Sequence, residues 1–171
     1  DILIVLHQMG NHGPAYYKRY PKEFEKFTPV CKTNQLENCT GEEINNAYDN
    51  AILYTDYFLS KTINFLKKYE NTHETGMLYV SDHGESLGEN GIYLHGMPYA
   101  IAPKEQIKVA SLIWLGDGQM AHEYDKSKIK DNKDKEYSHD NLFDTLLGLF
   151  EVKTEVYKKD LDILNDARKP E

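Results

Sequence analysis

The feature that most constrains this chain is a short apolar run that stops at a carboxylate and an imidazole. Met77-Leu78-Tyr79-Val80 has the length and composition of a buried strand, and Ser81-Asp82-His83-Gly84 follows it directly. In open α/β sheets, ligands bind in the crevice beyond the carboxyl ends of the strands. The pattern therefore predicts that Asp82 and His83 lie where such a fold carries out its chemistry.

These two residue types favour a metal site. A carboxylate oxygen and a neutral imidazole nitrogen are both ligands that zinc accepts, and a further imidazole, His95, follows a loop that contains three glycines. The simpler alternative is a turn in which Asp82 caps the chain and Gly84 provides unusual backbone angles. The two interpretations stay open on this stretch alone.

The start of the chain has the same design. Residues 1–6 (DILIVL) form an apolar run that is typical of a central parallel strand covered on both faces, and a loop with His7, His12 and Gly13 follows. Two strands that end in histidine-bearing loops can point at one place. We therefore expect a site role for His12, whereas His7 is interpreted as an ordinary loop residue without an assigned role.

Composition and charge restrict the class of protein. The chain has 171 residues and a net charge of −8, and its lysines and arginines are scattered, which argues against a nucleic-acid partner. No apolar run approaches the length of a membrane span. Because the chain begins inside a strand-like run, we interpret it as one domain, or the C-terminal part of one, from a larger protein.

Two cysteines, Cys31 and Cys39, enclose a polar segment that is typical of a surface loop. Their spacing fits neither a CxxC redox motif nor a zinc ribbon. We predict a disulfide, which would stabilise the fold by roughly 2–3 kcal/mol and would imply an oxidising compartment. Two unrelated free thiols are the alternative.

The other elements are predicted from periodicity. A long helix is expected from about Thr40 to Tyr69, with Thr40 as its cap, followed by strands at 77–80 and 109–115 and a short helix at 142–150. The order of strand, helix and strand predicts an α/β fold with a parallel crossover. Residues 120–137 are expected to be a solvated excursion and 151–171 a surface tail. His139, near the start of the short helix, is interpreted as structural.

Several long motifs are similar to those of one family. They are NHGPAYYKRYP from Asn11, the paired cysteines, SDHGESLGENGIYLHGMP from Ser81 and YSHDNLF from Tyr137. In this order and spacing, from about Asp1 to Val152, the chain resembles the bacterial phosphoethanolamine transferases of the alkaline phosphatase superfamily, which modify lipid A and include mobile polymyxin-resistance enzymes. The resemblance implies an α/β sandwich with a central, mostly parallel sheet flanked by helices. Residues 1–171 would form the C-terminal part of a sulfatase-like catalytic domain at the periplasmic face of the inner membrane.

The resemblance also implies roles for individual residues. Asp82 and His83 match ligands of the main zinc ion, and His12 and His95 match positions that bind the phosphoethanolamine group or a second zinc. Because both histidines follow apolar strands expected at neighbouring positions of one parallel sheet, we expect His12 and His95 to lie within a few ångströms of one another, across the cleft from the main zinc. Cys31 and Cys39 match a family disulfide. The threonine nucleophile and a glutamate ligand lie upstream in the family, as does the membrane domain, so no catalytic nucleophile is expected in this chain.

The implied reaction moves phosphoethanolamine from phosphatidylethanolamine to lipid A or another acceptor through a phosphorylated threonine. This chain would need the N-terminal portion of the same protein, and alone it is expected to be inactive. One alternative is a sulfatase or phosphodiesterase of the same superfamily, although such enzymes are not expected to carry the full NHGPAYYKRYP and HGMP motifs. The other alternative is a non-catalytic module that binds zinc or a lipid headgroup.

Overall fold

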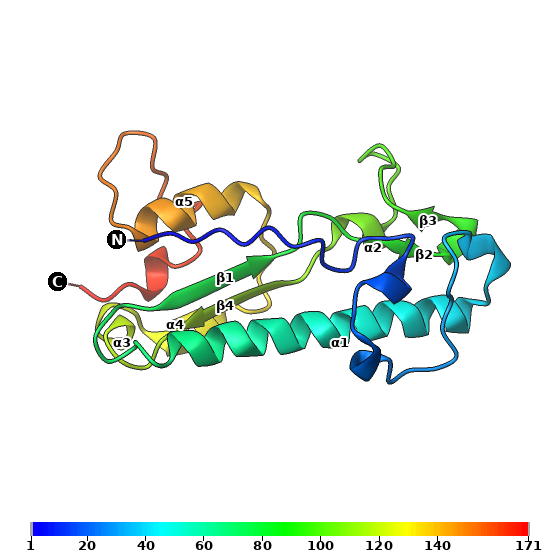
Figure 1. Ribbon diagram of the computed structural model, residues 1–171. Helices are drawn as coiled ribbons and strands as arrows, with labels where there is room; N and C mark the ends of the chain where they lie inside the picture. The colour runs from blue at the N-terminus through cyan, green and yellow to red at the C-terminus, as the bar shows by residue number, and fades with distance from the viewer. Residues whose placement is uncertain (1, 171) are drawn as a thin grey trace. The chain divides into compact units, whose positions relative to one another are not determined.

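The structure is a computed structural model that describes residues 2–170, and its elements are labelled in Figure 1. The helices are α1 (Gly41–Leu66), α2 (Lys104–Ile107), α3 (Met120–Glu123), α4 (Lys126–Asp131) and α5 (Asp140–Leu149). The strands are β1 (Gly76–Val80), β2 (Ser86–Leu87), β3 (Tyr93–Leu94) and β4 (Ser111–Leu115). The chain divides into two compact units, one formed by residues 4–64 and 79–112, and the other by residues 2–3, 65–78 and 113–170.

Helix α1 begins where the sequence predicts. The hydroxyl of Thr40 accepts a hydrogen bond from the backbone N–H of Glu43 at 3.2 Å, and the Glu43 carboxylate accepts one from the backbone N–H of Thr40 at 2.8 Å. This reciprocal capping box satisfies two backbone donors at the helix start. The helix ends at Leu66, three residues before the predicted end.

The unit formed by residues 4–64 and 79–112 has its core at the start of α1. Ile44 and Ala47 of the helix are buried against Tyr16 and Leu36, and the short strands β2 and β3 pack on the same cluster. The two strands pair antiparallel, with Ser86 opposite Leu94 and Leu87 opposite Tyr93. This core holds the loops that carry the histidines.

The predicted disulfide is confirmed. Cys31 and Cys39 are bonded, with their Cα atoms 5.7 Å apart, and Cys31 belongs to the same core. The backbone N–H of Cys31 also donates to the carbonyl of Glu43 at 3.0 Å, which ties the loop to the first turn of α1.

Buried Asn50 on α1 holds the irregular segment before the disulfide loop. Its amide oxygen accepts from the backbone N–H groups of Lys26 (2.7 Å) and Phe27 (2.9 Å), and its amide nitrogen donates to the carbonyl of Phe27 (2.9 Å). This irregular segment therefore packs on α1, through contacts such as that of the Phe24 ring with the Tyr54 ring.

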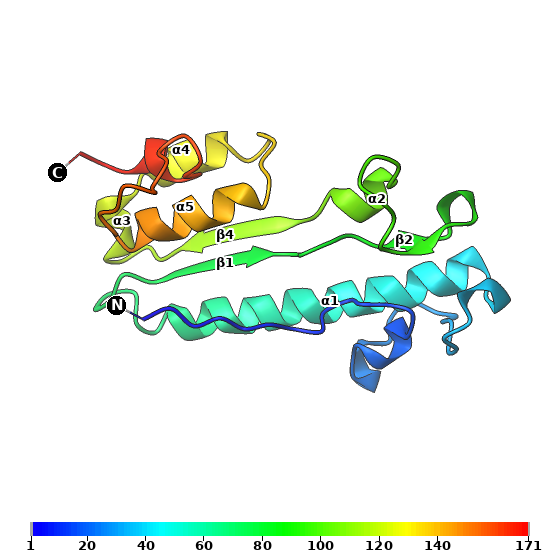
Figure 2. The ribbon, with the colours of Figure 1, turned by 90° about the horizontal axis from the view of Figure 1, so that it is seen from above.

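The chain has the predicted α/β class, but its strand pairing differs from the expectation. Strands β1 and β4 are neighbours, and their arrowheads point in opposite directions in Figure 2. Hydrogen bonds at their two ends agree, because Gly116 N–H donates to Thr75 and Ser81 N–H donates to Ala110. In the described part of the chain, these pairs are antiparallel.

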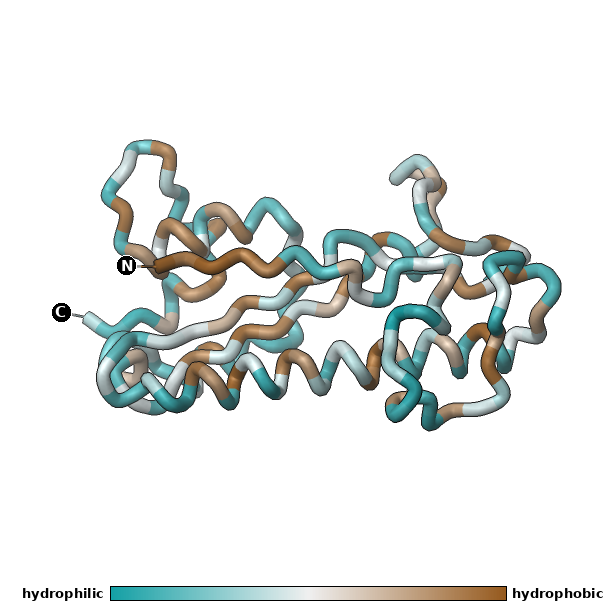
Figure 3. The backbone as a smooth tube through the Cα atoms, viewed as in Figure 1, coloured by the Kyte–Doolittle hydropathy of each residue, from teal (hydrophilic) through white to brown (hydrophobic). Residues whose placement is uncertain are grey.

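The predicted strand at the start of the chain is wrong for this structure. Residues 2–6 are not assigned to a strand, and the tube of this hydrophobic segment is brown in Figure 3. These five residues are 55–84% exposed. Extended backbone becomes a strand only when a neighbour supplies hydrogen bonds, which periodicity cannot guarantee. Residue 1 lies outside the described residues.

The second core corrects two further expectations. Met120 and Tyr124 fall within the predicted solvated excursion, and Leu164 and Ala167 fall within the predicted surface tail, yet all four are buried with Leu115 in one cluster. A few apolar residues in a charged segment are enough to form such a core when they pack against apolar residues from distant segments. Among the described residues, no helix is long and apolar enough to cross a membrane.

Candidate metal centre

The Asp82 loop turns sharply at the end of β1. Beyond Val80, the hydroxyl of Ser81 donates to the carbonyl of His83 at 2.7 Å, and Gly84 N–H donates to the carbonyl of Gln106 at 2.9 Å. A Cβ atom at Gly84 would lie 2.0 Å from the carbonyl oxygen of Glu105. Glycine is therefore required here by the close approach of another backbone segment.

The His12 loop is fastened on both sides. Arg19 Nε donates to the carbonyl of His12 at 2.7 Å, and the hydroxyl of Thr55 on α1 donates to the side-chain oxygen of Asn11 at 2.8 Å. A Cβ atom at Gly13 would lie 2.5 Å from the Cδ2 atom of Leu94. The loop can therefore approach the strand before His95 closely, because Gly13 has no side chain.

The two loops bring three imidazoles and one carboxylate together. His12, His83, Glu85 and His95 each offer a ligand atom, and these atoms lie within 4.8 Å of one another. The ring of His95 is 4.9 Å from that of His12 and 3.8 Å from that of His83, measured between centroids. The expected approach of His12 and His95 is confirmed, but His83 joins them instead of lying across a cleft.

Hydrogen bonds determine which nitrogen of each ring is free. Nδ1 of His12 lies 2.7 Å from the carbonyl of Gly13, Nδ1 of His83 lies 2.9 Å from the carbonyl of Gly84, and Nδ1 of His95 lies 3.1 Å from Glu85 Oε1. Carbonyl and carboxylate oxygens only accept, so each Nδ1 carries a proton. Nε2 of all three rings is then available to a ligand.

Glu85 is the residue that sequence reasoning missed. Its carboxylate accepts from Gly13 N–H and His95 Nδ1 through Oε1, and from the Tyr16 hydroxyl through Oε2 at 2.9 Å. Burial, together with the neighbouring Glu85 carboxylate, raises the pKa of Tyr16 well above its usual value. The available signal was an acidic residue two positions after His83, within a loop whose other acids are solvated.

Asp82 is placed differently from its neighbour. Its carboxylate is 80% exposed and lies 3.9 Å from His83 Nε2, and it is not part of the four-residue cluster. His7 is exposed and outside the cluster as well. His139 is the N-cap residue of α5, in agreement with its predicted place at a helix start.

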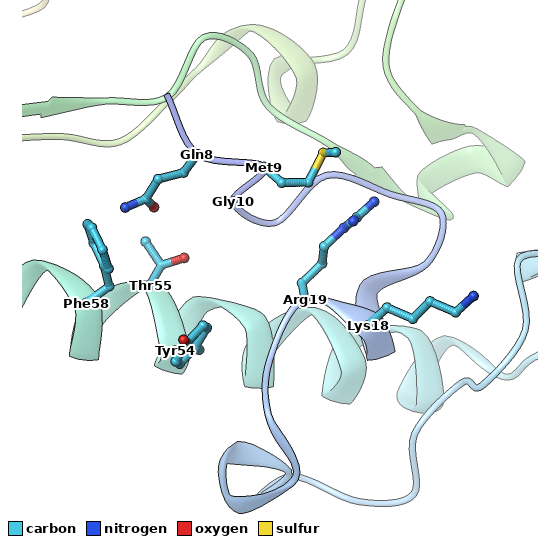
Figure 4. Close-up of a pocket in the computed structure, with 8 residues that line it drawn as sticks. All are labelled: Gln8, Met9, Gly10, Lys18, Arg19, Tyr54, Thr55 and Phe58. Atoms are coloured by element: carbon cyan, nitrogen blue, oxygen red, sulfur yellow. The ribbon is translucent and has the colours of Figure 1, made fainter. Parts of the chain in front are cut away.

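A separate pocket of about 350 Å³ is lined by residues 8–10, which precede His12, and by residues of α1 (Figure 4). Its lining includes two cations and no carboxylate: Gln8, Met9, Gly10, Lys18, Arg19, Tyr54, Thr55 and Phe58. In Figure 4 the side chain of Lys18 points away from Gln8 and Phe58. The pocket therefore provides no converging set of charges. The Arg19 side chain instead donates a hydrogen bond to the carbonyl of His12.

Comparison with known proteins identifies relatives at high identity. The chain is 52% identical over 171 residues to the phosphoethanolamine transferase EptA of Escherichia coli K12, covering 99% of this chain and 31% of that protein. The chain thus spans about a third of the length of this relative.

Solved structures of phosphoethanolamine transferases are also similar to this chain. The C-terminal periplasmic domain of the phosphoethanolamine transferase EptC from Campylobacter jejuni matches with a TM-score of 0.86 and 53% identity, over 93% of this chain and 50% of that one. The integral membrane protein lipooligosaccharide phosphoethanolamine transferase A from Neisseria meningitidis matches with a TM-score of 0.93 and 45% identity, over 96% and 31%. Both confirm the α/β fold class. The sulfatase family model matches residues 1–152, and the chain therefore belongs to the sulfatase family.

Proposed function

We propose that this chain is the C-terminal part of the periplasmic catalytic domain of a zinc-dependent enzyme that transfers phosphoethanolamine. The donor would be phosphatidylethanolamine and the acceptor lipid A or a similar hydroxyl-bearing molecule. The observation that carries the proposal is the cluster of His12, His83, Glu85 and His95, whose ligand atoms lie within 4.8 Å of one another. The relatives named phosphoethanolamine transferases, at 45–53% identity, support this choice of reaction.

The donor set of this cluster fits zinc. Imidazole nitrogen and carboxylate oxygen are ligands that zinc prefers, and the bonded Nδ1 atoms leave three Nε2 atoms free to bind. When bound, zinc supplies positive charge that activates a hydroxyl nucleophile and stabilises the negative charge that develops on a transferred phosphoryl group. We assign Asp82 and His83 to the main zinc ion.

We assign His12 and His95 to the phosphoethanolamine group or to a second zinc. Because Nδ1 of each ring already takes part in a hydrogen bond, Nε2 is the atom that can contact a metal or a phosphate. A neutral ring ligates metal through Nε2, whereas a protonated ring donates Nε2–H to a phosphate oxygen. Their 4.9 Å ring separation allows both to reach one phosphoryl group.

The nucleophile of the proposal lies outside this chain. A threonine in the upstream portion of the same protein would attack the phosphorus of phosphatidylethanolamine, release diacylglycerol and form a phosphothreonine bearing the ethanolamine ester. Attack of the acceptor hydroxyl on that phosphorus would then regenerate the threonine. The loops described here would hold the phosphoryl group during both steps.

The test uses the complete protein, purified in detergent, with labelled phosphatidylethanolamine and lipid A. We expect release of diacylglycerol and modification of lipid A, both lost in His83→Ala, and zinc content lowered in Asp82→Ala and His83→Ala. His73→Ala is the matched control, because His73 is an exposed imidazole bonded to Thr72. Transfer of the group to water alone would indicate a hydrolase, and zinc binding without turnover would indicate a non-catalytic module; either result would refute the proposal.

A further inference from the structure

Glu85 is a buried acid at the junction of the two histidine loops. Its side chain is only 4% exposed. Oε1 accepts from Gly13 N–H at 3.2 Å and lies 3.1 Å from His95 Nδ1, and Oε2 accepts from the Tyr16 hydroxyl at 2.9 Å. A buried carboxylate is costly unless it is well bonded, and these three donors satisfy it.

The three donors come from segments far apart in the sequence. Gly13 and Tyr16 precede Glu85 by 72 and 69 residues, and His95 follows it by 10. The carboxylate therefore joins the His12 loop to the His95 loop through charge-assisted hydrogen bonds, which are stronger than hydrogen bonds between neutral groups. Neither loop adjoins long regular structure: β2 and β3 before His95 have two residues each, and a three-residue 3-10 helix, Tyr16–Lys18, follows the His12 loop.

The bond to His95 also sets the direction of that ring. A carboxylate that accepts from Nδ1–H fixes the tautomer, limits rotation of the ring and makes Nε2 a better ligand. The Gly13 bond restrains the backbone next to His12 in the same way. Three donors already occupy most of the roughly four acceptor positions of the Glu85 carboxylate, two on Oε1 and one on Oε2, so little of it remains for a metal.

We propose that Glu85 is a positioning residue, which aims the Nε2 atoms of His95 and His12 at a bound zinc ion without ligating it. This inference rests on the proposed function, because it assumes that the cluster binds zinc. It goes beyond that function by dividing the four clustered residues into three that bind and one that orients them.

The test compares zinc affinity of the complete protein with that of Glu85→Gln by competition with a chelator. Glutamine keeps the shape but removes the charge and one acceptor oxygen. We expect zinc affinity to fall about 10–100-fold, the usual effect of losing a carboxylate that orients a ligand histidine. The visible absorption bands of the Co²⁺-loaded protein should keep their positions, because the ligands themselves are unchanged.

The matched control is Glu89→Gln, which alters an exposed carboxylate of the same loop that accepts from Leu87 N–H at 2.7 Å. It should bind zinc like the wild type. Tyr16→Phe removes one hydrogen bond to Glu85 and should lower zinc affinity by less than tenfold. This milder variant decides the question if Glu85→Gln does not fold.

Two results would overturn the positioning role. Wild-type zinc affinity in the Glu85 variant, or in Tyr16→Phe if that variant must decide, would show that the carboxylate does not orient the histidines. Shifted Co²⁺ bands would show that Glu85 is itself a ligand. Failure of the wild type to transfer phosphoethanolamine would refute only the proposed function, because zinc affinity is measured without turnover.

Discussion

Gly84 gives the sharpest test of how the site is built, because its substitution by alanine has a calculable cost. A Cβ atom there would lie 2.0 Å from the carbonyl oxygen and 3.0 Å from the carbonyl carbon of Glu105. Ordinary contact begins at 3.4 Å, and backbone cannot rotate away as a flexible side chain can. The segment at Glu105 must therefore retreat by about 1 Å or more.

The size of the stability loss follows from the contacts that this backbone displacement breaks. Overpacking costs about 1–3 kcal/mol, and loss of the bond from Gly84 N–H to the carbonyl of Gln106 costs about 1 kcal/mol more. We expect Gly84→Ala to lower the local free energy of opening by about 2–4 kcal/mol. Since His83 and Glu85 flank this residue, zinc affinity should fall as well.

Gly41→Ala is the matched control, because a Cβ atom at Gly41, the first residue of α1, meets nothing within 4 Å. This variant should be stabilised by about 0.4–1 kcal/mol, through loss of freedom in the unfolded chain. Hydrogen exchange by mass spectrometry on the complete protein measures both changes. In Gly84→Ala, amides of residues 83–86 and 104–108 should exchange about 30- to 700-fold faster. Unchanged exchange there would refute the steric argument.

Three further predictions concern stability, measured as the free energy of unfolding of the complete protein. Replacing Cys31 and Cys39 by serine should cost about 2–3 kcal/mol, because the disulfide closes a loop with a sequence separation of 8. Asn50→Ala should cost about 2–4 kcal/mol, since it leaves two backbone N–H groups and one carbonyl without their partner. Burial raises the pKa of Tyr124 from 10.0 to about 12, so stability should be full below pH 10 and fall as pH rises to 12. Tyr124→Phe should flatten this fall, with little cost at neutral pH because the hydroxyl has no partner among the described residues; a curve like the wild type would contradict it.

Features decided by neighbouring residues could be predicted from the sequence. The start of α1 was predictable because Thr40 and Glu43 satisfy each other's backbone groups within one turn. The disulfide was predictable because Cys31 and Cys39 are close along the chain. The strand at residues 1–6 was not, because an apolar run shows that a segment can be buried without showing which strand it pairs with.

The meeting of His12 and His95 was predicted for a reason that the structure does not support. The prediction assumed two adjacent parallel strands, yet residues 2–6 form no strand and His95 follows the antiparallel pair of β2 and β3. What joins the loops is Glu85. An acid in a glycine-rich polar loop is usually solvated, so its burial depends on donors 72 residues away, which no local pattern reveals.

Asp82 and His83 show why adjacent ligand residues need not face the same way. His83 joins the cluster with His95, whereas the exposed Asp82 carboxylate lies 3.9 Å from His83 Nε2. A zinc ion held by both residues would have two protein donors from this pair, and a structural or catalytic zinc needs at least three. The missing donors must then come from the other residues of the cluster or from residues outside this chain. Under the proposed function, the exposure of Asp82 favours the second source, because a solvated carboxylate would be accessible to the glutamate and threonine expected from the upstream part of the same protein.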